Sequence, residues 1–189
     1  MSRHIEEKDG LTLTHVDRVG DMAHAIAHKM QLPQDICTTI QFAAKIHDIG
    51  KLYIDQRILL KPDVLTPEEK EIIDAHTVIG SEVLRHDPNY DGVLFEKAND
   101  IILYHHENFD GSGYPMGLKG RAIPVSARIV RVADVYDALA HKRPYKEAWS
   151  HSEVLRYISD NSGTQFDPEI SSVFLSIAEE KAFLSFCPS

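Results

Sequence analysis

The spacing of apolar residues constrains this chain more than any other feature of its sequence. Along nearly the whole length apolar residues recur every three or four positions, and the alternation that is typical of strands is almost absent. This spacing places apolar side chains on one face of an α-helix, so the sequence predicts an all-α helical bundle. The 189 residues, 43% of them hydrophobic, fit one compact domain with a single core.

Helix start and stop signals divide the chain into segments. Thr66-Pro67-Glu68-Glu69 combines an N-cap, a proline at the first helical position and a capping-box glutamate, and Ser150 with Glu153 repeats the capping box. We expect helices over residues 14–30, 34–48, 66–86, 94–107 and 124–140, and two more that begin near Ser150 and at Asp167-Pro168.

Two segments fall outside this helical pattern. Residues 108–123 form a connection with four glycines and Pro115, and connections of this length inside a compact domain are often functional. Residues 1–12 are polar, and we expect a frayed N-terminal tail or the stub of a linker, followed by one domain over residues 13–189.

Charge and cysteine content exclude several classes of protein. A formal net charge of −9 argues against binding to a nucleic-acid polymer, which needs many cations against the phosphates. Cys37 and Cys187 are too few and too far apart for a disulfide framework or a zinc knuckle. With no signal pattern and no apolar run near eighteen residues, we expect a cytoplasmic protein that does not enter the membrane.

The chain has eleven histidines, and a helical wheel at about 100° per residue separates them into two sets. Six are predicted to lie at the surface: His4, His24, His28, His86, His141 and His151. The other five share apolar faces or end an apolar helix, together with two aspartates, and these seven ligand-type residues are His15, His47, Asp48, His76, His105, His106 and Asp134.

A single histidine on an apolar face is more often a hydrogen-bonded core residue than a metal ligand. Seven such groups directed at one interior change that balance, because buried polar groups need hydrogen bonds and buried charges need partners or a metal. Imidazole with carboxylate suits iron, manganese or zinc, and the lack of cysteine ligands disfavours a structural zinc site. His24 and His28 have the i, i+4 spacing of a metal pair but lack the glutamate of the zinc-protease motif.

Four segments resemble a known family. His47-Asp48-Ile49-Gly50-Lys51 is similar to the signature of the HD phosphohydrolase superfamily, and residues 105–115, which read HHENFDGSGYP, resemble the defining segment of the HD-GYP subfamily. The segments ADVYDAL at residues 133–139 and RPYK at residues 143–146 extend the resemblance, which covers residues 14–167. It implies an HD-type helical domain that hydrolyses cyclic di-GMP to linear pGpG and in some members onward to GMP, while other members prefer cyclic GMP-AMP.

By this resemblance the seven ligand-type residues hold two divalent metal ions, usually iron, with manganese as a substitute. Asp48 would bridge the ions, with His15, His47 and Asp134 on one and His76, His105 and His106 on the other. Members with a third metal carry a glutamate four residues before the first histidine, where this chain has Leu11, so two ions are expected. A hydroxide shared by the ions would attack phosphorus while the ribose 3′ oxygen leaves.

The resemblance also assigns substrate contacts. Lys51 would bind the scissile phosphate, although a lysine at the end of a helix can simply cap carbonyl groups. Arg143 and Lys146 match positions that hold phosphates, and as isolated surface cations they would carry no meaning. Gly113-Tyr114-Pro115 suits a turn whose aromatic ring either stacks on a guanine or plugs the loop against the core.

Two aspartates are candidates for orienting ligand histidines, namely Asp110 and Asp137, one turn beyond Asp134. The alternatives are a turn former and a helix-surface charge.

Other functions remain open at the level of sequence. A nucleotidase or deoxynucleotide triphosphohydrolase of the same superfamily would not need the Gly-Tyr-Pro loop or the RPYK segment. A catalytically silent cyclic-dinucleotide receptor would be expected to lack metal ligands, and none of the seven is missing. The family resemblance further suggests a regulatory receiver or sensor domain, or diguanylate cyclases, as partners.

Overall fold

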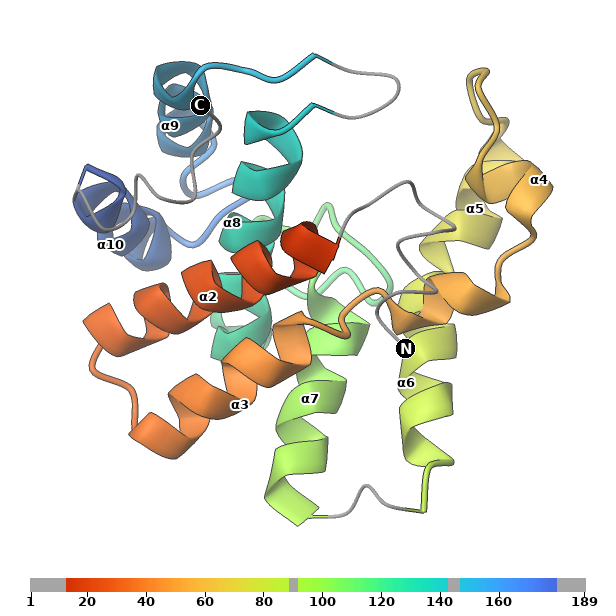
Figure 1. Cartoon of the computed structure of the whole chain (residues 1–189), viewed down its shortest axis with the longest axis horizontal. Helices are drawn as coiled ribbons and strands as arrows, with labels where there is room; N and C mark the ends of the chain where they lie inside the picture. Colours follow the sequence, from red (N-terminus) through yellow and green to blue (C-terminus); the bar gives the residue numbers. More distant parts are fainter. Residues whose placement is uncertain (1–12, 89–91, 143–146, 180–189) are drawn as a thin grey trace.

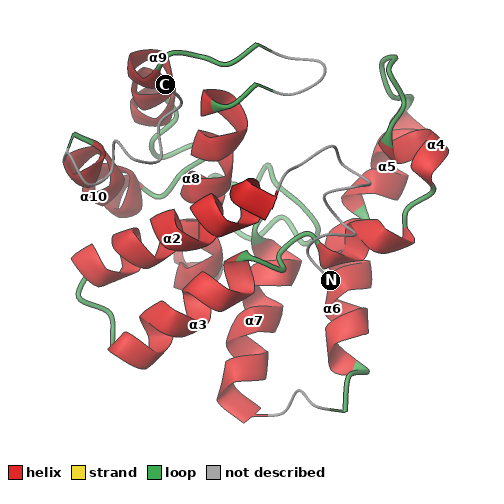
Figure 2. Ribbon diagram, viewed as in Figure 1, coloured by secondary structure: helices red, strands yellow, loops and turns green. Residues whose placement is uncertain are grey.

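The computed structural model describes residues 13–88, 92–142 and 147–179. Within these ranges the chain forms helices, turns and loops but no β-strand, which confirms the predicted all-α fold (Figure 2). The predicted tail over residues 1–12 and two predicted phosphate contacts, Arg143 and Lys146, lie outside the described residues.

The helices follow one another in a simple order along the chain (Figure 1). None of those in the described ranges is both long enough and apolar enough to cross a membrane. Their bounds are α2 Leu13–Lys29, α3 Gln34–Ala44, the 3-10 helix η1 Ile49–Tyr53, α4 Gln56–Leu59, α5 Pro67–Asp74, α6 His76–Arg85, α7 Gly92–Tyr104, the 3-10 helix η2 Gly120–Ala122, α8 Val125–Ala140, α9 His151–Asp160 and α10 Pro168–Ala178.

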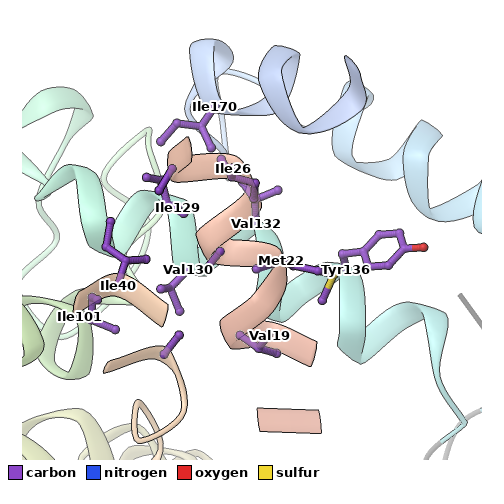
Figure 3. Packing of buried hydrophobic residues seen from close by; sticks show 14 of the residues in the cluster. Val19, Met22, Ile26, Ile40, Ile101, Ile129, Val130, Val132, Tyr136 and Ile170 are labelled. Carbon is purple, nitrogen blue, oxygen red and sulfur yellow. The ribbon is translucent and has the colours of Figure 1, made fainter. Parts of the chain in front are cut away.

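The core lies between α2, α3, α7 and α8. Helix α2 packs against α3 and α8, and α3 packs against α7. Their facing stripes contribute fully buried side chains such as Met22, Ile26, Ile40, Ile101 and Val130 (Figure 3). Burial of each large apolar side chain stabilises the fold by about 1.5–3 kcal/mol. One continuous apolar cluster also reaches α9 and α10, in agreement with the predicted single core.

The predicted helix starts are confirmed where caps were recognised. The Thr66 hydroxyl accepts from the backbone N–H of Glu69 while the Glu69 carboxylate accepts from the N–H of Thr66. Ser150 and Glu153 form the same reciprocal pair at the start of α9. Asp167 caps α10 through its side chain.

Three predicted helix ends are wrong. The helix predicted over residues 34–48 ends at Ala44, the one predicted over 94–107 ends at Tyr104, and the one predicted over 66–86 is split into α5 and α6 at Ala75. The short elements η1, α4 and η2 were not predicted. A histidine follows each of the three helix ends within three residues. Its side chain hydrogen-bonds to a carbonyl group of the last turn.

Helix η1 lies unusually close to α6. A Cβ atom added at Gly50 would lie 1.9 Å from the carbonyl oxygen of His76 and 2.7 Å from the amide nitrogen of Gly80. Only glycine permits this approach, because both nearest atoms belong to the backbone and cannot rotate away. The contact holds the segment that carries Asp48 and Lys51 against the start of α6, where His76 lies.

Candidate metal centre

The structure brings the seven ligand-type side chains together from five parts of the chain. They form two groups whose nitrogen and oxygen atoms lie within 4.8 Å of one another inside each group, and every side chain is buried or half-buried. One group is Asp48, His76, His105 and His106, and the other is His15, His47 and Asp134.

Asp48 lies between the two groups. Its Oδ1 is 3.2 Å from Nε2 of His76 and 3.6 Å from Nε2 of His105, whereas its Oδ2 is 3.4 Å from Nε2 of His47. Asp134 Oδ1 lies 3.7 Å from Nε2 of His15 and 3.8 Å from Nε2 of His47. Ligand atoms of one cation lie about 3–4 Å from one another when each is about 2.0–2.2 Å from the cation. The distances here match that spacing. The Asp48 carboxylate therefore directs one oxygen to each group.

Three ligand histidines are oriented by the ends of helices. Nδ1 of His47 donates to the carbonyl of Ala44 at 2.6 Å, and Nδ1 of His76 donates to that of Ile73 at 2.7 Å. Nδ1 of His105 lies 3.0 Å from the carbonyl oxygens of Ile101 and Ile102. Carbonyl groups in the last turn of a helix lack some of their intrahelical partners, and here the imidazoles donate to carbonyls of these last turns. With the proton on Nδ1, Nε2 of a neutral ring presents its lone pair to the interior.

His15, on α2, is oriented differently. Its Nδ1 lies 2.5 Å from Oδ2 of Asp137, on α8, and Asp137 also accepts from Nε of Arg18 at 2.5 Å and from Nδ1 of His141 at 3.2 Å. Burial would raise the pKa of Asp137, but the hydrogen bonds from His141, His15 and Arg18 outweigh it and hold that pKa far below its ordinary value. An ionised Asp137 thus fixes the His15 ring.

Two observations indicate that these residues fit a pair of divalent cations. Among the described residues, Nε2 of His15 and Oδ1 of Asp48 are buried with no hydrogen-bond partner, which is costly unless another ligand is present. The Nε2 atoms of His76 and His105 face each other at 3.5 Å, and with both lone pairs directed inward a cation between them would relieve the repulsion. Nitrogen and oxygen donors without a thiolate suit iron, manganese or zinc.

The electrostatics of the centre also favour positive charge. Burial lowers the pKa of His47, but the charges of Asp48 and Asp134 more than compensate and raise it to about 9. Burial by itself would raise the pKa of Asp48. The charges of Lys51 and His47 outweigh burial and keep the pKa of Asp48 well below its usual value. Burial lowers the pKa of His105 to about 4 despite the nearby Asp48. Asp48 is therefore a carboxylate and His105 a neutral imidazole, as metal binding requires, whereas His47 has to lose a proton when it binds a metal.

Lys51 lies at the edge of the centre. It belongs to η1 rather than to the end of a long helix, and its Nζ is 2.7 Å from Oδ2 of Asp48, with 16% of the side chain exposed. The ammonium group therefore lies beside the carboxylate that joins the two groups and still reaches solvent.

The glycine-rich loop covers His106. A Cβ atom at Gly113 would lie 2.2 Å from the amide nitrogen of Asn108, so the loop approaches the turn after α7 as only glycine allows. The ring of Tyr114 stacks on that of His106, with centroids 4.8 Å apart, and meets the edge of His76 at 6.4 Å. The structure thus shows Tyr114 packed against His106 and His76, and the stacking of its ring on a guanine stays a prediction.

The two aspartates considered as orienting residues differ. Asp137 contacts His15 directly, whereas Asp110 accepts from the backbone N–H and the hydroxyl of Ser112 at 2.9 and 2.6 Å. Asp110 is exposed and has the geometry of a turn former, the alternative noted for it from the sequence.

Several residues of the site were not found from the sequence. Glu107 is buried and accepts from the backbone N–H groups of Met116 and Leu118, which ties the glycine-rich loop to the turn after α7. Arg131 contacts His106 and Asn108, and Arg18 contacts Asp137. Spacing offered a signal, because Arg131 precedes Asp134 by three residues and Arg18 follows His15 by three, one helical turn in each case.

Most histidines predicted at the surface lie away from the centre. His24 and His28 stack on each other on α2 with ring centroids 6.3 Å apart, and His86 is largely exposed. His151 hydrogen-bonds to the hydroxyl of Tyr136. Among the described ones His141 is the exception, because it contacts Asp137 and so belongs to the surroundings of His15.

Comparisons with known proteins agree with this geometry. The model of the HD domain family matches residues 1–170, and the chain therefore belongs to that family. It is 45% identical over 175 residues to a Thermotoga maritima protein named cyclic di-GMP phosphodiesterase, covering 93% of this chain and 47% of the relative. It is 42% identical to the cyclic di-GMP phosphodiesterase response regulator RpfG of Xanthomonas campestris pv. campestris, covering 93% of this chain and 46% of the relative. The resemblance to HD-GYP domains is confirmed, and the chain spans about half the length of these relatives.

A solved structure supports the same fold. The structure of a cyclic GMP-AMP specific phosphodiesterase of Vibrio cholerae, V-cGAP3, is similar with a TM-score of 0.69 at 21% identity, covering 97% of this chain and 50% of the other. At that identity the likeness shows the fold alone.

Proposed function

We propose that this chain is a metal-dependent phosphodiesterase that hydrolyses cyclic di-GMP to linear pGpG at the centre built around Asp48. The observation that carries the proposal is the convergence of five histidines and two aspartates in two groups with buried, unpaired ligand atoms. The names of the relatives from Thermotoga maritima and Xanthomonas campestris support cyclic di-GMP as the substrate. A regulatory domain and diguanylate cyclase partners stay predictions from the family resemblance.

We assign His15, His47, Asp48 and Asp134 as ligands of one ion, and Asp48, His76, His105 and His106 as ligands of the other. Iron is the metal we expect, with manganese as a working substitute. When bound, such a pair supplies an activated water and neutralises charge on the phosphate. The histidines and carboxylates hold the ions and exclude other solvent, since most of their atoms are buried.

Three parts of the chain would position the substrate. The Lys51 ammonium, held by Asp48 at 2.7 Å, lies where it can neutralise a phosphoryl oxygen as negative charge spreads over it. Tyr114 and the backbone at Gly113 wall the centre beside His106. We keep Arg143 and Lys146 as proposed contacts to the ligand's phosphates, with bidentate geometry for the guanidinium.

The test is to reconstitute the purified chain anaerobically with iron or manganese and to offer cyclic di-GMP and cyclic GMP-AMP separately. We expect cyclic di-GMP to be converted to linear pGpG. The products are separated and measured by chromatography. A His24→Ala, His28→Ala double variant is the matched control, because it removes two histidines of α2 that lie outside the centre. Its rate should equal that of the unaltered chain.

Two outcomes would contradict the proposal. Turnover of cyclic GMP-AMP with none of cyclic di-GMP would show that the substrate is wrong but the reaction right. Two bound metals without turnover of either dinucleotide would favour a receptor that binds the ligand without cleaving it.

A further inference from the structure

His106 differs from the other four histidines of the centre in the partner of its Nδ1 atom. For His15, His47, His76 and His105 that partner is an oxygen acceptor, either a carbonyl or a carboxylate. For His106 it is NH1 of Arg131, at 3.3 Å.

This contact fixes the proton on the imidazole of His106. A guanidinium group has only N–H donors and no acceptor, so the Nδ1 atom facing it has to accept. A neutral imidazole that accepts at Nδ1 carries its proton on Nε2. In the other four rings Nδ1 faces an oxygen acceptor and therefore carries a proton. His106 is thus protonated at the nitrogen that its neighbours leave open.

The position of Arg131 adds a charge conflict. It lies on α8 one turn before Asp134, its side chain is half-buried, and its Nε is buried with no hydrogen-bond partner among the residues that the structure describes. A divalent cation held by His106 would lie close to this fixed positive charge, with little water to screen it. Guanidinium and metal ion therefore oppose each other at the same imidazole.

Arg131 also connects His106 to the glycine-rich loop. Its NH2 donates to Oδ1 of Asn108 at 2.9 Å, and Nδ2 of Asn108 lies 3.1 Å from the hydroxyl of Ser112. Movement of the guanidinium away from His106 would therefore also change the hydrogen bonds of residues 108–112 of the loop. The amide of Asn108 offers Arg131 a second anchor that does not involve the metal centre.

We propose that Arg131 competes with a divalent cation for His106. The group around Asp48 then binds its ion through Asp48, His76 and His105, and His106 joins only when the guanidinium leaves the ring. The inference rests on the metal centre of the proposed function and deepens it, because it makes this ion the more weakly bound of the two and makes Arg131 a positioning residue. In the other group, Nδ1 of His15 and of His47 faces an oxygen acceptor rather than a guanidinium.

The tautomer can be measured directly in the metal-free chain. Two-bond ¹H–¹⁵N correlation spectra distinguish imidazoles protonated at Nδ1 from those protonated at Nε2, and a His106→Gln variant assigns the signal. We expect the Nε2–H form for His106 in the unaltered chain and the Nδ1–H form after Arg131→Met. An Nδ1–H signal for His106 in the unaltered chain would overturn the inference without any variant having to fold.

Metal binding gives the second readout. The metal-free chain is titrated with Mn²⁺ alone in a calorimeter, and two binding steps are fitted. Arg131→Met should tighten the weaker step by about tenfold to a hundredfold, the size of effect seen when a residue beside a metal ligand is changed, and leave the stronger step unchanged. Arg131→Lys keeps the charge and should tighten the weaker step less.

Arg156→Met is the matched control, because it removes an exposed arginine from α9 and lowers the net charge equally. It should change neither step. If Arg131→Met and Arg131→Lys leave both steps unchanged or weaken either, the competition is disproved while hydrolysis stays possible. If the unaltered chain binds no Mn²⁺ or iron at all, the proposed function itself is wrong.

Discussion

The two groups of side chains that share Asp48 are oriented by different parts of the protein. In the group of His76 and His105, the imidazoles are held by backbone carbonyls at the ends of α5 and α7. In the other group, His15 is held by the Asp137 carboxylate, which Arg18 and His141 bind in turn. The orientation of His76 and His105 thus depends on the path of the main chain, whereas that of His15 depends on a network of charged side chains, so the two halves should fail in response to different substitutions. His47, in the half of His15, is held by the carbonyl of Ala44.

The largest effect should come from the residue that belongs to both halves. Asp48→Ala removes the carboxylate that faces His76 and His105 with one oxygen and His47 with the other. We expect loss of both ions, measured by metal analysis after gel filtration, and a fall in hydrolysis of more than about a hundredfold. Asp63→Ala, an exposed aspartate, is the control. Full activity of Asp48→Ala would remove it from the shared position.

The half that depends on the main chain should be broken by a change that moves the backbone. In Gly50→Ala the new methyl group would meet the carbonyl oxygen of His76, so η1 and α6 would have to separate. We expect a loss of about 3 kcal/mol in the free energy of unfolding, measured by urea denaturation of the metal-free chain. We also expect weaker binding of the ion assigned to His76.

Gly120→Ala separates this clash from the ordinary cost of replacing a glycine. Gly120 has a φ of +61° and open space where a Cβ would lie, so alanine there is strained but meets no neighbour. Its cost should be about 1 kcal/mol, with metal binding unchanged. Equal losses at Gly50 and Gly120 would argue that the approach of η1 to α6 is not what holds His76.

The comparison also explains what could be predicted from the sequence. The repeat of apolar residues predicts the helices, and the wheel grouped the seven residues that the structure brings together. The wheel grouped His47, His105 and His106 correctly although they lie beyond the helix ends. The turn that follows each helix keeps roughly the helical direction, so these side chains still point to the predicted face. The predicted helix ends were misplaced, because the rule for helix ends relies on glycine and proline and does not detect a histidine that binds a carbonyl of the last turn.

The residues around the ligands were harder to predict because their contacts join distant parts of the chain. His15 and Asp137 lie 122 positions apart, and Arg131 reaches back 25 positions to His106. Helical spacing places Arg18 near His15 and Arg131 near Asp134, but it does not say which charge on another helix each one meets. Asp110 shows the reverse case, in which a suitable residue type beside the site binds only its own turn.

The half that depends on side chains should respond to Asp137→Asn. The amide keeps the shape of the carboxylate but loses the charge that holds Arg18, His15 and His141 together. We expect the ion assigned to His15 to bind about tenfold to a hundredfold more weakly in a Mn²⁺ titration, with the other ion affected much less. Equal weakening of both ions would show that the two halves are not independently oriented.

The smallest effect on the centre should come from Ser150→Ala, which tests whether the loss in Asp137→Asn is local or follows from lower stability. Ser150 and Glu153 form the capping box of α9, a helix that carries none of the seven ligand-type residues. Loss of the hydroxyl should cost about 1 kcal/mol in the free energy of unfolding, because the backbone N–H of Glu153 loses its acceptor. Both Mn²⁺ affinities should stay unchanged, because α9 supplies no ligand-type residue to either group. If Ser150→Ala weakened the ion of His15 as much as Asp137→Asn does, the effect would belong to the stability of the bundle, and the orientation of His15 by Asp137 would lose its support.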